Sequence, residues 1–143
     1  MTVSAILKHK GHDVATVPPD HTIAAVVALL AARRIGAVVV MQGTHLAGIL
    51  SERDVMYALA QHGAAALAMT AGALMTTDVH TATPATTYDQ ANRAMTDGRF
   101  RHMPVLDHGR LAGIVSIGDV VKARMMEQET EVDGLRAYVA GAA

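Results

Sequence analysis

Two copies of the pattern Ser-x-x-Asp are the residues of this sequence best suited to hold a small polar molecule. Ser51 and Asp54 form the first copy, and Ser116 and Asp119 form the second, each directly after an apolar run. Where a strand turns into a helix at such a serine, free backbone N–H groups and the hydroxyl can hold a phosphate. A carboxylate one turn later can accept hydrogen bonds from both hydroxyls of a ribose. The pattern therefore predicts ligands for the two polar parts of a nucleotide.

The same pattern also has a purely structural interpretation. A serine at the N-cap satisfies an unpaired backbone N–H group, and an acidic residue in the first turn favours the positive end of the helix dipole. One isolated copy would favour this interpretation. Two copies at equivalent places, each with its helix N-terminus directed at the boundary between the copies, favour ligand binding.

The sequence is a tandem repeat of one small unit. The segment 46–55 returns almost intact 65 residues later as 111–120, and the same displacement needs no gap from 13 to 55. A match at a fixed period over this length predicts two copies of a supersecondary unit packed about a pseudo-twofold axis. The two Ser-x-x-Asp patterns then belong to the two clefts where the copies meet.

Each copy has the same predicted order of elements, β-α-β-β-α. In each copy a β-branched stretch is followed by apolar residues at helical spacing and then by two apolar runs that form a hairpin. A capping box from Thr87 to Gln90 marks the start of the helix in the second copy, and Gly98 is expected to end it. The fold class is therefore α/β (α+β), with two pseudo-twofold-related units in one compact module. In the first copy the first four elements are expected at 14–17, 23–30, 37–41 and 46–50, and the last helix follows Ser51 with apolar residues at Val55, Met56 and Leu59.

The repeat sets the expected boundaries. The first unit covers 1–66 and includes a short helix at its start, and the second covers 67–125, with a helical linker at 64–74. A separate C-terminal helix is expected over 126–143. Its apolar residues predict that it packs on the module or on a second subunit.

Composition excludes several classes of function. With 143 residues, 51% hydrophobic and 17% charged, the chain can bury a proper core. The aromatic content of 3% and the net charge of −1, without a basic stripe, exclude stacking on single strands and binding to duplex nucleic acid. The lack of cysteine fits a reducing compartment. With neither a leader pattern nor a long apolar run, a soluble cytoplasmic protein without membrane contact is expected.

Neither a metal site nor a catalytic site is predicted. His9 and His12 are spaced to share a helical face, but flanking lysines repel a cation and no third ligand is evident. A nucleophilic enzyme would need a serine beside a histidine and its orienting acid, and no such constellation is identifiable. The chain is therefore not expected to be an enzyme.

The repeated motifs resemble the paired cystathionine-β-synthase (CBS) domain module, also called a Bateman module. The resemblance covers about residues 3–125 and rests on two Thr-x-x-Pro elements, Thr16–Pro19 and Thr81–Pro84, on the hairpin ending Leu-Ala-Gly-Ile-(Leu/Val), and on the two Ser-x-x-Asp patterns. It implies a regulatory module that binds adenine nucleotides in the clefts between its repeats. It also implies a homodimer in which two modules form a flat disc.

The resemblance assigns roles to particular residues. Asp54 and Asp119 would bind ribose, and Ser51 and Ser116 would bind phosphate. An adenine pocket would be formed by strand residues and their neighbours, namely Thr16, Val17, Ile35, Gly36, Ala37, Thr81, Met103, Pro104 and Ile114.

The two copies are not equivalent in charge. Arg53 lies inside the first motif, whereas Ile117 and Gly118 occupy the matching places in the second. The ligands or affinities of the two sites should therefore differ. Positive charge for further phosphate contacts is expected from Arg99, Arg101 and His102, although this segment can also be interpreted as a solvated basic edge.

The leading hypothesis is a sensor that binds AMP, ADP, ATP or NAD and signals by conformational change, as a homodimer or through an unidentified regulated protein. S-adenosylmethionine shares the adenosine half, but Arg53 favours a ligand with phosphate. Two rival hypotheses stay open. One is an interaction module with vestigial pockets, and the second is an enzyme acting on a nucleotide.

Overall fold

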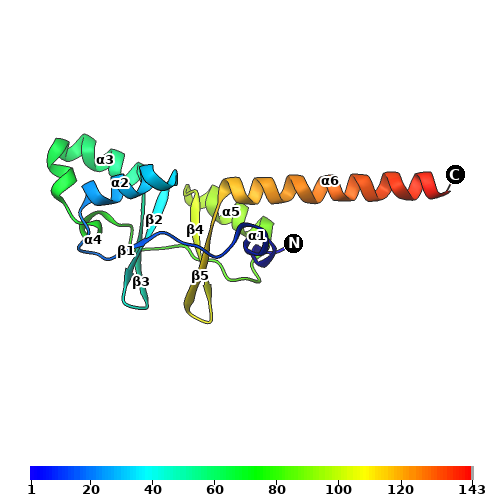
Figure 1. Ribbon diagram of the computed structural model, residues 1–143, viewed down its shortest axis with the longest axis horizontal. Helices are drawn as coiled ribbons and strands as arrows, with labels where there is room; N and C mark the ends of the chain where they lie inside the picture. Colours follow the sequence, from blue (N-terminus) through cyan, green and yellow to red (C-terminus); the bar gives the residue numbers. More distant parts are fainter. Residues whose placement is uncertain (143) are drawn as a thin grey trace.

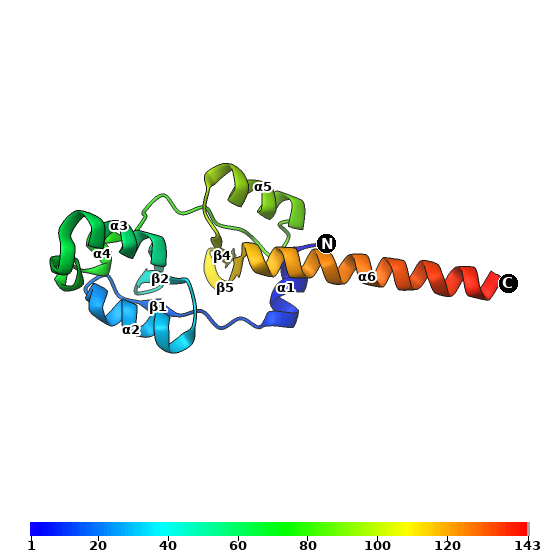
Figure 2. The same ribbon diagram turned by 90° about the horizontal axis from the view of Figure 1, so that it is seen from above.

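The computed structural model of the protein describes residues 1–142. Two similar α+β halves lie side by side, and a long C-terminal helix extends from the second half (Figures 1 and 2). The elements are α1 (Val3–Lys10), β1 (Thr16–Val17), α2 (Ile23–Arg33), β2 (Ala37–Gln42), β3 (His45–Ser51), α3 (Glu52–His62), the 3-10 helix η1 (Gly63–Ala68), α4 (Ala71–Leu74), α5 (Tyr88–Gly98), β4 (His102–Asp107), β5 (Arg110–Ser116) and α6 (Ile117–Ala142).

The predicted order of elements is confirmed in the first repeat and shortened in the second. The first sheet has the order β1-β2-β3, with β1 parallel to β2 and β2 antiparallel to β3. In the second repeat only the hairpin β4-β5 forms a sheet, because the counterpart of β1 is a single bridge between Ala82 and Val105. The two hairpins have equivalent registers, with Ala37 opposite Ser51 and His102 opposite Ser116. The segment that enters each hairpin therefore lies beside the start of the helix that follows the hairpin.

The N-terminal helix α1 packs on the second repeat, although the sequence places it at the start of the first unit. Val3, Ile6 and Leu7 are buried with Met95 and Val115 in the core of the second repeat. Backbone bonds fix this position, from the N–H of Val3 to the carbonyl of Thr86 at 2.8 Å and from Ser4 to Pro84 at 2.9 Å.

The short helix α4 makes the reciprocal exchange. It precedes the second repeat in sequence, yet Ala71 is buried in the core of the first repeat with Val17 and Leu50. Its N-terminus is bonded to that repeat through Ala71 N–H and the His21 carbonyl at 2.7 Å. Each half is therefore completed by a helix that lies outside its contiguous sequence.

Two further expectations about helices are modified. The linker at 64–74 consists of η1 and α4, which are separated by Met69 and Thr70. The last helix of the second repeat and the expected C-terminal helix are one 26-residue helix, α6. Neither a proline nor a capping residue with its turn interrupts the chain near residue 126, so nothing stops the helix there. Among residues 1–142 no helix is both long and apolar enough to cross a bilayer.

Candidate functional site

Both Ser-x-x-Asp patterns form capping boxes at helix N-termini. The N–H of Ser51 donates to Oδ2 of Asp54 at 2.9 Å, and the N–H of Asp54 donates to Oγ of Ser51 at 3.3 Å. Ser116 and Asp119 repeat this geometry at 2.9 and 3.1 Å. The structural interpretation of the pattern is thus realised. Within residues 1–142 these bonds engage one carboxylate oxygen of each aspartate and leave the other available for a ligand.

The first cleft lies where the N-terminus of α3 meets the second repeat. Its cavity of about 360 Å³ contains Ser51, Arg53 and Asp54 from the first repeat and the segment 98–102 from the second. Arg53 reaches across the cleft, with Nη1 3.5 Å from the carbonyl oxygen of Arg99. Arginines from both repeats therefore line the same cavity as the Asp54 carboxylate.

An arginine in the left-handed conformation precedes the hairpin on each side. Arg99 has φ 55° and Arg34 has φ 54°, and each forms the C-cap of the preceding helix. Gly98, expected to end α5, is instead its last helical residue, and the chain reverses at Arg99. This reversal directs the next residues into the clefts.

The first cleft also contains residues that the sequence analysis missed. The rings of His80 and Phe100 stack with centroids 4.7 Å apart and planes inclined by 15°. Thr76, Asp78 and Val79 complete this wall. The 65-residue displacement could have drawn attention to this segment, because Asp78 and Val79 repeat Asp13 and Val14.

The second cleft is the pseudo-symmetric counterpart, with a cavity of about 590 Å³ beside Ser116 and Asp119. Here Nζ of Lys10 donates to Oδ2 of Asp119 at 2.6 Å and to the carbonyl oxygen of Ile114 at 2.9 Å. Burial acts to raise the pKa of Asp119, but the bonds from Lys10 and Ser116 outweigh it, and the pKa is lowered. The carboxylate is therefore ionised and already paired.

His102 lies between the clefts and contributes to the walls of both. Burial lowers its pKa, although the nearby Glu52 carboxylate acts in the opposite direction, so the imidazole is neutral at pH 7. Gly36 approaches this ring so closely that an added Cβ would lie 3.1 Å from it. A side chain at position 36 would require the histidine ring to shift by a few tenths of an ångström.

Most of the predicted site residues line a cleft, and five do not. The first cleft contains Ser51, Arg53, Asp54, Arg99, Arg101 and His102, and the second contains Ile35, Gly36, Ala37, Ile114, Ser116, Asp119 and His102. Val17 and Met103 are buried in the two cores, because alternate strand residues face opposite sides. Thr16, Thr81 and Pro104 line neither cleft.

Three histidine or acidic side chains close enough to hold a metal ion are not found together in residues 1–142. An ionised aspartate, several arginines and a neutral histidine suit a ligand that has both hydroxyl groups and negative charge.

Two α+β repeats that exchange a helix, with two clefts at their boundary, define a tandem-repeat module. Comparison with known proteins identifies its family. The family model described as "CBS domain" matches residues 3–61 and 71–126. The chain therefore belongs to the CBS domain family, and the resemblance found in the sequence is confirmed.

Similar proteins match over most of this chain. The CBS-domain containing protein ATU1752 from Agrobacterium tumefaciens is 48% identical, with a TM-score of 0.85, and the match covers 87% of this chain and 99% of that one. The CBS domain protein PAE2072 from Pyrobaculum aerophilum, solved as a complex with AMP, is 26% identical with a TM-score of 0.77, covering 91% and 99%. The mitochondrial CBS domain-containing protein CBSX3 of Arabidopsis thaliana is 34% identical, covering 98% and 72%.

Proposed function

We propose that this chain is a regulatory module that binds an adenine nucleotide in its first cleft. The observation that carries the proposal is one cavity that is lined both by Asp54 and by arginines from the two repeats. Asp54 would accept hydrogen bonds from the ribose hydroxyls, and Arg53 and its neighbours would bind phosphate. The AMP complex of PAE2072, which shares the fold, supports an adenine nucleotide as the ligand.

Arg53→Ala is expected to weaken binding of AMP about ten- to a hundredfold and to leave adenosine nearly unchanged, because a charge-assisted hydrogen bond to phosphate contributes about 1.5–3 kcal/mol. Titration calorimetry with both ligands measures the difference. Arg110→Ala, at the exposed tip of the second hairpin, is the matched control. Equal losses for AMP and adenosine would show that Arg53 does not contact the phosphate.

We propose that the ion pair of Lys10 with Asp119 makes the second cleft the weaker ribose site, because it neutralises the carboxylate. The ammonium group occupies Oδ2, and only about a third of the lysine side chain is exposed. A sugar diol that uses both carboxylate oxygens would have to compete with this ion pair, and one that binds Oδ1 alone would meet a carboxylate of reduced charge. The two clefts therefore differ in affinity, with the first as the stronger site.

Lys10→Met is expected to raise the affinity of the second cleft for adenosine about two- to tenfold, which corresponds to the modest strength of a partly exposed ion pair. Adenosine is the appropriate ligand because a phosphate could itself attract Lys10. NMR titration of residues near Asp119 follows this cleft separately. Lys8→Met, on the same helix but exposed, is the control, and an unchanged or lower affinity in Lys10→Met would show that Lys10 does not weaken this site.

A thermal-shift panel tests the proposed function. Ligand at about 100 times its dissociation constant adds about 2.7 kcal/mol of stability, which shifts the melting temperature by several degrees. The panel contains AMP, ADP, ATP, NAD, S-adenosylmethionine, adenosine and GMP. A selective rise with one adenine nucleotide supports the proposal and names the ligand. A flat response of folded, ligand-free protein favours an interaction module with empty clefts.

The proposal extends to assembly and location. Two copies are expected to associate through the apolar face of α3 and α6, which exposes Met56, Tyr57, Val121 and Met125. Binding is expected to alter the arrangement of the repeats without chemical change of the nucleotide, and an unidentified protein would read that arrangement. The cytoplasm is the proposed compartment, and cell fractionation would distinguish it from the mitochondrion named for the plant relative.

A further inference from the structure

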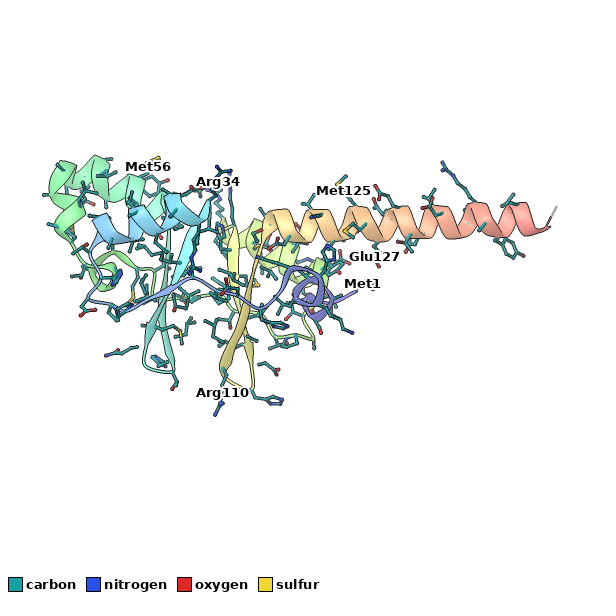
Figure 3. All side chains as sticks on the ribbon, in the orientation of Figure 1. Met1, Arg34, Met56, Arg110, Met125 and Glu127 are labelled. Carbon is teal, nitrogen blue, oxygen red and sulfur yellow. The ribbon has the colours of Figure 1, made fainter. Side chains whose placement is uncertain are left out.

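The face of α6 that points away from the body of the protein carries a continuous seam. Figure 3 shows Met125 directed to the side opposite Glu127 and Met1. The seam residues alternate at intervals of four and three, which is the spacing of a coiled coil. The apolar members of the seam are about half exposed or more. Their exposed fractions are 50% for Val121, 57% for Met125, 47% for Val132, 65% for Leu135 and 61% for Val139, and Gln128 is the polar member.

The second half of α6 makes little contact with the rest of the chain. Both ribbon views show it extending beyond every other element, and residues 128–141 are all exposed. Gly134 and Gly141 each cost about 1 kcal/mol relative to alanine in a helix. A solitary segment of this length is marginal in water, because most helix stability comes from packing an apolar face. The seam therefore needs a partner.

The heptad positions indicate a second copy in parallel orientation. Val132 and Val139 occupy a positions and Leu135 occupies a d position, and β-branched a residues with leucine at d favour two parallel strands. In that arrangement a g residue meets the e residue five places later in the other chain. Glu131 then meets Arg136 of the second copy.

The charges beside the seam discriminate between orientations. In the parallel arrangement Arg124 also meets Glu129 of the second copy, although Arg124 is already paired with Asp89. An antiparallel arrangement at full overlap would place Glu129 against Glu129, Glu131 against Glu131 and Lys122 against Arg136. Opposite charges therefore meet in the parallel arrangement, and like charges repel each other in the antiparallel arrangement.

We propose that α6 forms a parallel, in-register, two-stranded coiled coil with α6 of a second copy. This inference rests on the proposed association of two copies, but not on nucleotide binding. It also fixes the orientation, because a twofold axis along α6 brings equivalent repeats of the two copies together. The first clefts then lie at the same end of the dimer.

Single cysteine variants of the full chain test the arrangement, because the natural sequence has no cysteine. Gln128→Cys and Leu135→Cys should each crosslink to themselves on mild oxidation, since identical d residues face each other in a parallel coil. Ala137→Cys, on the opposite side of the helix, is the matched control and should not crosslink. Non-reducing electrophoresis measures the dimer.

A mixture of Gln128→Cys and Val132→Cys distinguishes the antiparallel arrangement. Crosslinking in this mixture, without self-crosslinking of Gln128→Cys or Leu135→Cys, would show an antiparallel pair, which overturns the inference and leaves the proposed association intact. A monomer in sedimentation equilibrium would overturn both. Nucleotide binding is measured separately, so its failure affects neither outcome.

Charge exchange gives a second test without cysteine. Glu131→Lys should weaken the dimer about two- to tenfold, because the lysine of each chain then faces Arg136 of the other chain. The double variant Glu131→Lys with Arg136→Glu should restore the dissociation constant. Sedimentation equilibrium measures all three proteins, and a double variant weaker than the single one would overturn the parallel register.

Discussion

Asp54→Asn is expected to weaken AMP binding at the first cleft about ten- to a hundredfold. The substitution removes the charged acceptor for two ribose hydroxyls, and hydrogen bonds to charged groups contribute about 1.5–3 kcal/mol. Asparagine is preferable to alanine because its amide oxygen can still accept from the N–H of Ser51, as Oδ2 of Asp54 does at 2.9 Å. The cap of α3 is thereby preserved while the ligand contact is lost.

Titration calorimetry with AMP measures this effect, and thermal unfolding without ligand checks that the fold is retained. Asp119→Asn is the matched control, because it makes the same change in a cleft that Lys10 already occupies. It should leave the stronger site intact. An affinity unchanged by Asp54→Asn would remove Asp54 from the ribose site, and equal losses in both variants would contradict the inequality of the clefts.

The repeat predicted the clefts, because it is a property of the whole chain. A displacement that is constant from 13 to 55 requires two similar units, and similar units pack with related boundaries. The junctions at Ser51 and Ser116 follow from local capping chemistry, which the structure confirms. Both kinds of information are present in the order of residues.

The contact of Lys10 with Asp119 could not be predicted in this way. The two residues are 109 positions apart, and the order of the chain places α1 in the first unit. Sequence order assigns a helix to its neighbours, whereas packing assigns it to the surface that buries its apolar face. The direction in which strand side chains point could not be predicted for a similar reason, because Val17 and Met103 are apolar enough for a pocket and also for the core that they occupy.

The length of α6 exposes another limit of sequence reasoning. The repeat ends near residue 125, but a boundary of similarity is not a boundary of structure. A helix ends where its backbone is capped or broken, and the sequence around residue 126 does neither. The difference in charge between Arg53 and the matching position of the second repeat was by contrast predictable, because it depends only on residue type at aligned positions.

Leu7→Ala is expected to destabilise the protein by about 2–5 kcal/mol, although Leu7 lies near the N-terminus, where substitutions are usually tolerated. The side chain is 2% exposed and packs in the core of the second repeat. It also fills the space above Gly113 of β5, where an added Cβ would lie 2.6 Å from Cδ2 of Leu7. Truncation leaves a cavity that a rigid strand beneath it cannot close.

Urea unfolding of Leu7→Ala measures the loss, and two controls interpret it. Leu7→Met conserves volume and should cost less than about 1.5 kcal/mol, while Lys8→Ala on the exposed side of α1 should be nearly neutral. Since α1 also carries Lys10, a loosened helix should release Asp119 and leave AMP binding at the first cleft unchanged in the folded protein. A loss below about 1 kcal/mol would show that α1 does not complete the second repeat, and Lys10 would then have no rigid support for its ion pair with Asp119.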